Sequence, residues 1–468
     1  MANTANTADK ANMWNGEKAD GLRVGLFLQT ENHKNKADFE LDMDIAKEMD
    51  FDVLVFPENC YYPDCEHVDF CFFNPTAEYF QIKCDNLVSG FMDVSRNIGK
   101  AVIFGLKDSA GFRLNFYVNA NANEAKGETA GAYYVKHVMT ENSGLGFSDY
   151  KQTFDMSFPV INLKGWKIGM TAGEDCTHAP FSRAYGLQNV DMILNSTLGD
   201  VVYDKWYKFN KARAIENGCF NFVVTGSNCR NDKAKGFVDG FNGQGKEMPY
   251  VNNKGVSDDP GQFDTIYVFD TRDDDGQSSK DTGLDLIEKE NKHSQTEIPV
   301  GNVTELIEKA EKLDDNLYVL PVGEAGSGIG QCNLVICVAD GMDIMAPEKV
   351  MPLMYSEKLT DVANKRYLIV NRHEGAIDEE IFANKLSVIL KVRSMENFCA
   401  VVLESENKNG CYQCANNGTV QLIAGTDGKY EIDLKRMAGP EAIWKDKQGA
   451  MNSKWRKNFE FLVERIGK

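Results

Sequence analysis

Three reactive side chains follow strand-like runs in the first half of this sequence. Glu58 ends the run DVLVFPE, Lys136 ends GAYYVK, and Cys176 follows WKIGMTAGED. Because the carboxyl ends of strands in an α/β sheet meet at one edge, where ligands usually bind, we expect the three side chains to lie together. A cysteine attacks as its thiolate, a carboxylate can take the thiol proton, and a lysine can face the oxyanion of a tetrahedral intermediate. These residue types predict a hydrolytic site.

The elements that must position these residues alternate between strands and helices. Continuous apolar runs are typical of strands buried on both faces, and such runs occur at 52–58, 101–107 and 166–172. Helices are predicted over 34–49, 75–98 and 205–218, the last ending at Gly218. This alternation predicts an α/β layered domain over residues 21–272, after a polar, disordered tail at 1–20.

The motifs resemble, in order and spacing, those of the carbon–nitrogen hydrolase (nitrilase) superfamily. VFPENCYYP, YYVKH and GWKIGMTAGEDC are similar to its three catalytic motifs. KFNKARAIENGCFNFVVTGSN, GFVDGFNGQGKEM and FDTIYVFDT are similar to a helix and strand, a hairpin and a last core strand that follow in that family. The resemblance covers about residues 22–272. Within its helix motif, Arg213, Glu216 and Asn217 are interpreted as a scaffold that supports the site.

The resemblance implies a fold, a reaction and roles for individual residues. The fold would be a four-layer αββα sandwich of the α/β class. Glu58 would be the general base, Lys136 the oxyanion stabiliser and Cys176 the nucleophile that attacks the C–N carbon of an amide or nitrile. Ammonia or an amine would leave, and water would then release the acid from a thioester. The family uses no metal or organic cofactor, and its members pair through an outer helical layer, which implies a homodimer or larger homo-oligomer.

Some residues near this triad match the family pattern loosely or depart from it. Glu141 stands where many members carry a second glutamate, and its role is open between catalysis and a structural salt bridge. His178 takes a usually acidic position, where it would line the substrate pocket, cap a helix or lie at the surface. Glu174 and Asp175 replace an apolar pair, and their charge would raise the pKa of Cys176 unless they pair elsewhere. The substrate is left open, with an amide favoured over a nitrile.

A second, smaller α/β domain is predicted over residues 300–468, after a polar linker at 273–299. Strands are predicted at 316–322, 333–340, 366–372 and 398–406, followed by a closing hairpin over 419–434. The motif CYQC at 411–414 is interpreted as a turn, and no internal repeat is recognised between the two halves. Because this part has no assigned role, a second hypothesis is a regulatory or assembly protein. Its C-terminal domain would bind a partner or ligand, and the hydrolase domain would be an effector or a degenerate scaffold.

Charge and composition limit the classes of partner and the cellular compartment that we expect for this protein. The formal net charge of −19 disfavours nucleic acid and anionic membranes as partners. No run approaches eighteen apolar residues and no signal peptide is recognised, so we expect a cytoplasmic protein with reduced thiols. The small-molecule substrate is implied by the resemblance alone. One stretch rich in cysteine and histidine fits no standard zinc spacing, so no metal site is predicted there. It holds Cys60, Cys65, His67 and Cys71, with Cys84 further on.

Overall fold

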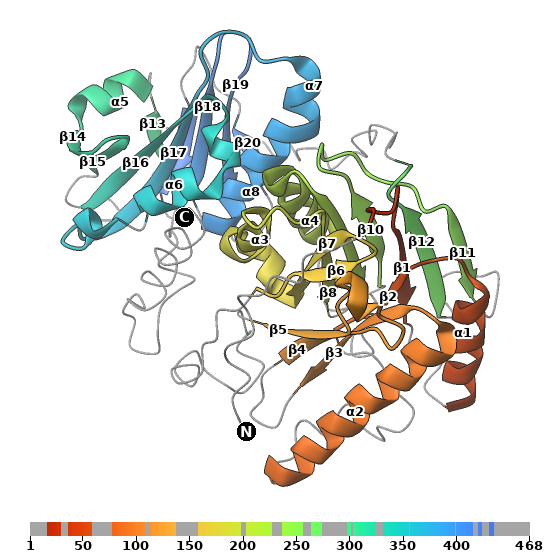
Figure 1. Cartoon of the computed structure of the whole chain (residues 1–468). Helices are drawn as coiled ribbons and strands as arrows, with labels where there is room; N and C mark the ends of the chain where they lie inside the picture. The colour runs from red at the N-terminus through yellow and green to blue at the C-terminus, as the bar shows by residue number, and fades with distance from the viewer. Residues whose placement is uncertain are drawn as a thin grey trace. The chain divides into compact units, whose positions relative to one another are not determined.

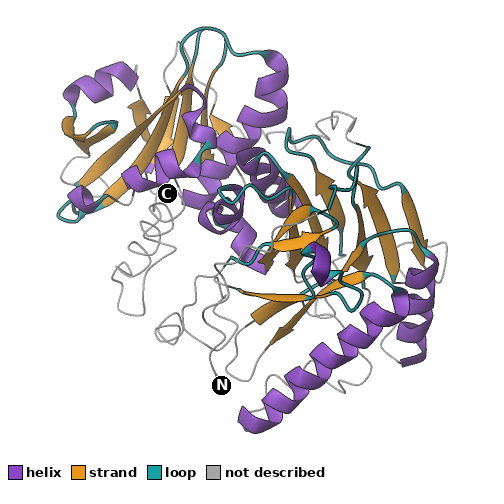
Figure 2. Ribbon diagram, viewed as in Figure 1, coloured by secondary structure: helices purple, strands orange, loops and turns teal. Residues whose placement is uncertain are grey.

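The chain divides into two compact units, Met1–Ser278 and Ser279–Lys468, in a computed structural model (Figure 1). We call them the N-terminal and the C-terminal unit. The structure describes residues 16–29, 36–58, 77–107, 113–136, 158–197, 203–226, 236–255, 264–273, 297–300, 303–322, 331–354, 356–397, 399–414, 420–423 and 430–434. Both units combine sheets with helices (Figure 2), which confirms the predicted α/β class.

The first sheet of the N-terminal unit has seven strands, of which the central three are parallel. Parallel neighbours need long crossover connections, and helices α1 (Lys36–Glu48) and α2 (Ala77–Ile98) supply them. In order across the sheet, the strands are β11 (Asn252–Gly255), β12 (Thr265–Asp270), β1 (Arg23–Leu28), β2 (Val53–Val55), β3 (Ala101–Lys107), β4 (Arg113–Val118) and β5 (Gly131–Val135).

The second sheet of the N-terminal unit has five strands, joined in part by helices α3 (Ala179–Gly186) and α4 (Tyr203–Asn217). Its order is β10 (Val238–Phe241), β9 (Phe220–Thr225), β8 (Met192–Thr197), β7 (Trp166–Ala172) and β6 (Ile161–Leu163). The end of α4 is as predicted, because Gly218 follows it with a φ of +60° that favours glycine.

Alternating side chains build the layers of this unit. Val53 and Val55 of β2 pack in a core with residues of the second sheet such as Met170, whereas Leu54 packs with Phe91 of α2. On the other side of the second sheet, a Cβ at Gly169 of β7 would come within 2.6 Å of the Tyr185 ring of α3, so this helix lies directly on the strand. The order is helices, sheet, sheet, helices, which confirms the predicted four-layer sandwich.

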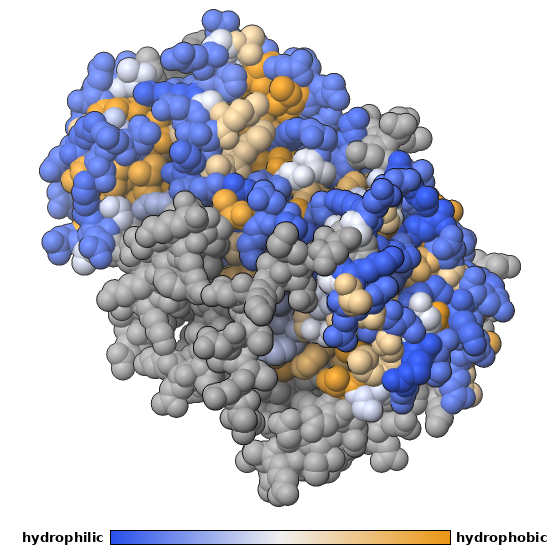
Figure 3. All heavy atoms as spheres, in the orientation of Figure 1, coloured by the Kyte–Doolittle hydropathy of each residue, from blue (hydrophilic) through white to orange (hydrophobic). Residues whose placement is uncertain are grey.

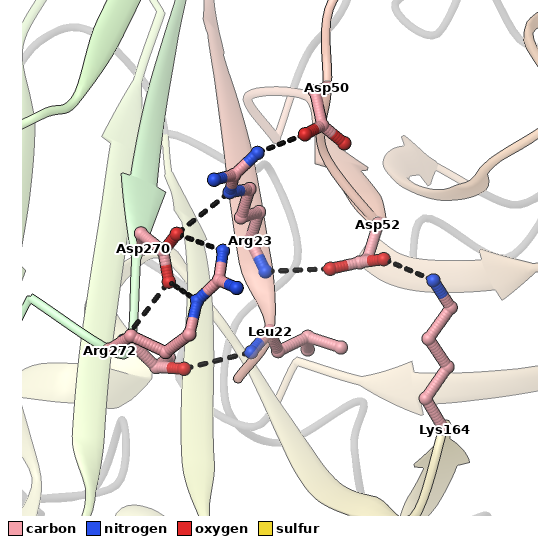
Figure 4. Close-up of polar contacts among 8 residues, drawn as sticks. Leu22, Arg23, Asp50, Asp52, Lys164, Asp270 and Arg272 are labelled. Carbon is pink, nitrogen blue, oxygen red and sulfur yellow. Dashed lines mark hydrogen bonds and ion pairs between the residues drawn. The ribbon is translucent and has the colours of Figure 1, made fainter. Parts of the chain in front are cut away.

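Ion pairs join strands at the amino-terminal edge of the first sheet (Figure 4). Arg23 of β1 donates from Nε to Asp270 Oδ2 of β12 at 2.7 Å, and Arg272 Nε donates to the other carboxylate oxygen at 2.9 Å. The Arg23 amide also donates to Asp52, which forms an ion pair with Lys164 of the β6–β7 turn. Side-chain hydrogen bonds from Arg272, which has the larger effect, and from Arg23 hold the pKa of the Asp270 carboxyl below its usual range. The network ties β12, β1, the start of β2 and the second sheet together.

The C-terminal unit contains a seven-stranded sheet with helices α6 (Pro347–Met354) and α8 (Ser387–Asn397) in its crossovers. A π-helical turn (Phe382–Leu386) and the short α7 (Glu379–Ile381) precede α8. The strand order is β14 (Glu311–Asp314), β15 (Leu317–Val322), β16 (Cys332–Asp340), β17 (Lys365–Arg372), β18 (Ala400–Glu404), β19 (Asn409–Cys414) and β20 (Val420–Ile423). Helix α5 (Val303–Lys309) and a ribbon of β13 (Glu297–Val300) and β21 (Tyr430–Asp433) share a core with this sheet.

Two predictions for the end of the chain are wrong. The residues at 419–434 do not form one hairpin, because β20 pairs with β19 and β21 pairs with the distant β13. The CYQC motif is not a turn but the end of strand β19, where Cys411 is fully buried and pairs with Ile423. The Asn-Gly pair at 409–410 suggested a turn, yet it begins the strand and lies opposite the end of β18.

Hydrophilic residues dominate the described surface on the face drawn in Figure 3, with smaller apolar areas between them. Among the described residues, the large hydrophobic side chains that are exposed come from several separate parts of the chain. They are Leu41, Tyr133, Tyr203, Tyr250, Val251, Met342 and Ile381. Single exposed apolar residues of this kind are ordinary and identify no binding surface.

Candidate active site

The turn that carries Cys176 is held directly against Glu58 and Lys136. Strand β7 ends at Ala172, and a five-residue 3-10 turn, Gly173–Thr177, leads toward α3. Gly173 has a φ of +48°, and a Cβ at this position would collide with the Glu58 carboxylate and the Lys136 ammonium group. Only glycine fits both the backbone conformation and the space. The structure therefore places the turn that carries Cys176 against Glu58 and Lys136, and Cys176 itself is 1% exposed.

Glu58 and Lys136 form a buried ion pair. Lys136 Nζ lies 3.0 Å from Glu58 Oε1 and 3.2 Å from Oε2, and neither side chain is more than 2% exposed. The main chain of Glu58 passes so close over Gly105 of β3 that no Cβ would fit there. Its amide donates to the carbonyl of Thr197 at 3.3 Å, at the end of β8. Strand ends from both sheets thus fix the main chain of Glu58.

The two acidic residues that precede Cys176 each form a polar contact with another side chain. Glu174 forms an ion pair with the Lys136 ammonium group. Asp175 is fully buried and accepts a hydrogen bond of 2.7 Å from the Tyr134 hydroxyl. Burial is the largest cause that raises the pKa of the Cys176 thiol, and the two carboxylates add to it in the same direction. The expected charge effect is present, but it is secondary to desolvation of the thiol.

Helix α4 and strand β8 supply the polar contacts on the other side of Cys176. Arg213 Nε donates to the Cys176 carbonyl at 2.8 Å, and this positive charge lowers the thiol pKa against the effect of burial. Asn195 forms a hydrogen bond with the thiol that acts in the same direction. Asn210 Nδ2 lies 3.9 Å from Sγ, and its Oδ1 accepts from Asn195 at 3.1 Å. Arg213 was predicted from the sequence, but neither asparagine was. Asn195 could have been found, because it is a polar residue inside the apolar run MILNS.

His178 and Glu141 remain predictions. His178 is half-buried and occupies the N-cap position of α3, but its side chain makes no capping hydrogen bond. Its Nδ1 lies 2.9 Å from Thr177 Oγ1 and 3.2 Å from the Glu174 carbonyl, so the ring is turned back onto the 3-10 turn. Glu141 lies outside the described residues.

The described residues contain neither a metal-binding cluster nor a membrane-spanning helix. Within the described ranges, no three His, Cys, Asp or Glu side chains are grouped as a metal site requires. The cysteine- and histidine-rich stretch and the Cys84 side chain lie outside what the structure describes. No helix in the described part of the chain is both long and apolar enough to cross a membrane.

Residues 11–242 match the family model of the carbon-nitrogen hydrolases. A comparison with curated proteins found no match. Among solved structures, a cysteine-to-serine mutant of the Nesterenkonia AN1 amidase from the nitrilase superfamily is 17% identical, with a TM-score of 0.40, over 55% of this chain and 95% of that chain. Another structure of an amidase from Nesterenkonia sp. is 17% identical, with a TM-score of 0.41, over 57% and 96% of the two chains.

The family match lies within the N-terminal unit and spans Glu58, Lys136 and Cys176. The same unit has the four layers and the ordered motifs that the resemblance implied. The N-terminal unit of this chain belongs to the carbon–nitrogen hydrolase family.

Proposed function

We propose that the N-terminal unit hydrolyses a non-peptide C–N bond, that of an amide rather than a nitrile, through a thioester on Cys176. The observation that carries this proposal is the contact of the Gly173 turn with the buried Glu58–Lys136 pair. The proposed base, cation and thiol would act in a buried place, where electrostatic interactions are strong.

The proposed reaction has two halves. Burial raises the pKa of the Cys176 thiol, so at neutral pH the thiol enters the reaction protonated. Glu58 takes the proton as Sγ attacks the carbonyl carbon, and Lys136 faces the oxyanion that forms. The proton passes to the leaving nitrogen, ammonia or an amine departs, and the thioester remains. Water then attacks the thioester and gives a proton to Glu58, which passes it to Sγ as the C–S bond breaks, so that the acid and the free thiol are released.

Ammonia release from a panel of primary amides and nitriles tests this proposal. Cys176→Ala should lower turnover by about 10³-fold or more, because the nucleophile is lost. Cys219→Ala is the matched control, since Cys219 is also a buried thiol whose pKa is raised to about 12 by burial, but it follows α4 rather than the 3-10 turn. Equal activity of the two variants, or hydrolysis of nitriles without amides, would contradict the proposal.

Assembly and location belong to the same proposal. The resemblance to the family favours a homodimer or larger homo-oligomer that acts on a small molecule, and the scattered free cysteines favour the cytoplasm. Sedimentation of the full-length chain tests the assembly, and a monomer at micromolar concentration would contradict it.

A further inference from the structure

The large sheet of the C-terminal unit has the same topology as the sheet that carries Cys176. In the order β6, β7, β8, β9, β10, successive pairs are antiparallel, parallel, parallel and antiparallel. In the order β15, β16, β17, β18, β19, the four pairs follow the same sequence. Helices α3 and α4 occupy the two parallel crossovers of the β6–β10 sheet, as α6 and α8 do in the large sheet of the C-terminal unit (Figure 1).

The turn after the second strand is also repeated. The 3-10 turn Gly173–Thr177 follows β7, and a 3-10 turn of equal length, Gly341–Met345, follows β16. The glycine that opens each turn has a positive φ, +48° in the first and +53° in the second. The residue after each turn donates its amide to an aspartate carbonyl, Asp175 at 3.1 Å and Asp343 at 3.0 Å. The two turns therefore align residue by residue.

In each unit, an arginine from the helix of the second parallel crossover, α4 or α8, holds the turn at the same place. Arg213 Nε donates to the Cys176 carbonyl at 2.8 Å, and Arg393 Nε donates to the Ile344 carbonyl at 3.0 Å. Each arginine pairs with a glutamate three residues on, and an asparagine four residues on donates back to the arginine carbonyl at 2.8 Å or 2.9 Å. We call each set a clamp: Arg213, Glu216 and Asn217 in one unit, Arg393, Glu396 and Asn397 in the other.

The strand register agrees with this alignment. Asn195 of β8 lies opposite Thr171, two residues before the first glycine, and Asn371 of β17 lies opposite Ala339, two residues before the second. Both asparagines are fully buried. The strand register, the 3-10 turn and the clamp thus all match the two units in the same way. In this alignment, Ile344 occupies the position of Cys176.

We propose that the C-terminal unit is a catalytically silent second copy of the half of the hydrolase domain that carries Cys176. Ile344 is fully buried and has no nucleophilic atom. The face that packs on the first sheet in the N-terminal unit here packs with α5 and the β13–β21 ribbon, through residues such as Val303 and Ile432. In the described part of the C-terminal unit, this face therefore meets no equivalent of the first sheet, from which Glu58 and Lys136 come. Its clamp holds a turn that does no chemistry.

A graft in the full-length chain tests the structural part of this proposal. The substitutions Met342→Glu, Ile344→Cys, Met345→Thr and Ala346→His give the second turn the residues of the first. Because the turns share geometry, the melting temperature should fall by less than about 5 °C, from the smaller side chain at position 344. The control is Met342→Cys with Ile344→Glu, which buries a carboxylate and should cost far more. A graft as destabilising as this control would overturn the proposal.

The same graft tests catalytic silence. Combined with Cys176→Ala, it should form no thioester at position 344 when the protein is incubated with an amide substrate of the wild-type chain and examined by mass spectrometry. A thioester at position 344 would overturn the proposal. The result is distinguishable from failure of the proposed function, since that function fails when Cys176→Ala alone retains full turnover, whatever the graft does to the melting temperature.

Discussion

Lys136 Nζ lies 3.0 Å from Glu58 Oε1 in a pair that is almost fully buried, and Glu174 adds a second carboxylate to the same ammonium group. Removing one partner of a buried ion pair leaves an uncompensated charge and typically costs about 3–5 kcal/mol. Here the second carboxylate softens that cost, because Lys136 keeps one partner when the other is neutralised. The pair can therefore be probed by conservative substitutions in a folded protein.

Gly173→Ala should damage both stability and activity. The substitution forces a positive φ on alanine and also places a Cβ against the Glu58–Lys136 pair. Gly99→Ala is the matched control, since Gly99 also has a positive φ, +74°, but has nothing within 4 Å of its added Cβ. Strain alone should cost about 1–2 kcal/mol in the control.

Denaturant unfolding and amide turnover of the two glycine variants measure the difference. Gly173→Ala should lose more stability than Gly99→Ala, and only Gly173→Ala should lose most of its turnover. Equal losses of stability and turnover in both variants would mean that the turn does not contact the Glu58–Lys136 ion pair.

Glu174→Gln should make the thiol of Cys176 more reactive at a given pH. Glu174 raises the pKa of this thiol, so neutralising it moves the pKa down and increases the thiolate fraction at every pH below it. The rate of alkylation by iodoacetamide as a function of pH measures this shift. Glu48→Gln is the control, because Glu48 is exposed and pairs with Lys254. A profile displaced upward, or displaced equally in the control, would contradict the assignment.

Arg213→Lys and Arg393→Lys should separate positioning from folding. Lysine keeps the charge but cannot reproduce the Nε–H bond to the turn carbonyl together with the glutamate pair. Arg213→Lys should lower kcat about 10- to 100-fold with KM within about twofold, since the nucleophile is displaced. Arg393→Lys should leave kcat unchanged and speed hydrogen exchange in β16–β18. Loss of kcat in both variants would show that the clamps act only through global stability.

Asp270→Asn should lower the thermal stability of the protein at neutral pH and make that stability less sensitive to acid. The arginines hold the Asp270 pKa in the folded protein below its unfolded value of 3.8. The contribution of the Asp270 carboxylate to folding stability is therefore fully present above the pKa of the unfolded state. It is lost as the pH falls through the pKa of the folded state. The melting temperatures of wild type and variant should differ by about 3 °C or more at pH 7 and converge below pH 4. Asp93→Asn, at an exposed pair with Arg96, should have no effect.

The sequence predicted the parts of this fold that depend on neighbouring residues. The strands before Glu58, Lys136 and Cys176 and the helix stop at Gly218 follow from local apolar patterns and backbone preferences. The pairing of Glu174 with Lys136 could not be predicted, because it depends on how two sheets pack across a separation of 38 residues. Likewise, β21 pairs with β13, and no local turn signal reveals a partner so far away in the chain.

The repeat was missed although part of its signal is local. ARAIENGC at 212–219 and VRSMENFC at 392–399 share an arginine, a glutamate, an asparagine and a cysteine at equal spacing. The turns share only a glycine and an aspartate, and the nucleophile position changes from cysteine to isoleucine. With so few common residues, the equal strand order and register were needed to make the correspondence visible.

The central claim is that Cys176 carries the acyl group during hydrolysis. Mass spectrometry of the wild-type chain, quenched during turnover of an amide substrate, tests it most directly, because the thioester is then caught before water releases the acid. We predict an added mass equal to the acyl group, located on the peptide that contains Cys176 and absent from the Cys176→Ala variant. Turnover of the same amide by Cys176→Ala, or an acyl group on a different residue, would contradict the account.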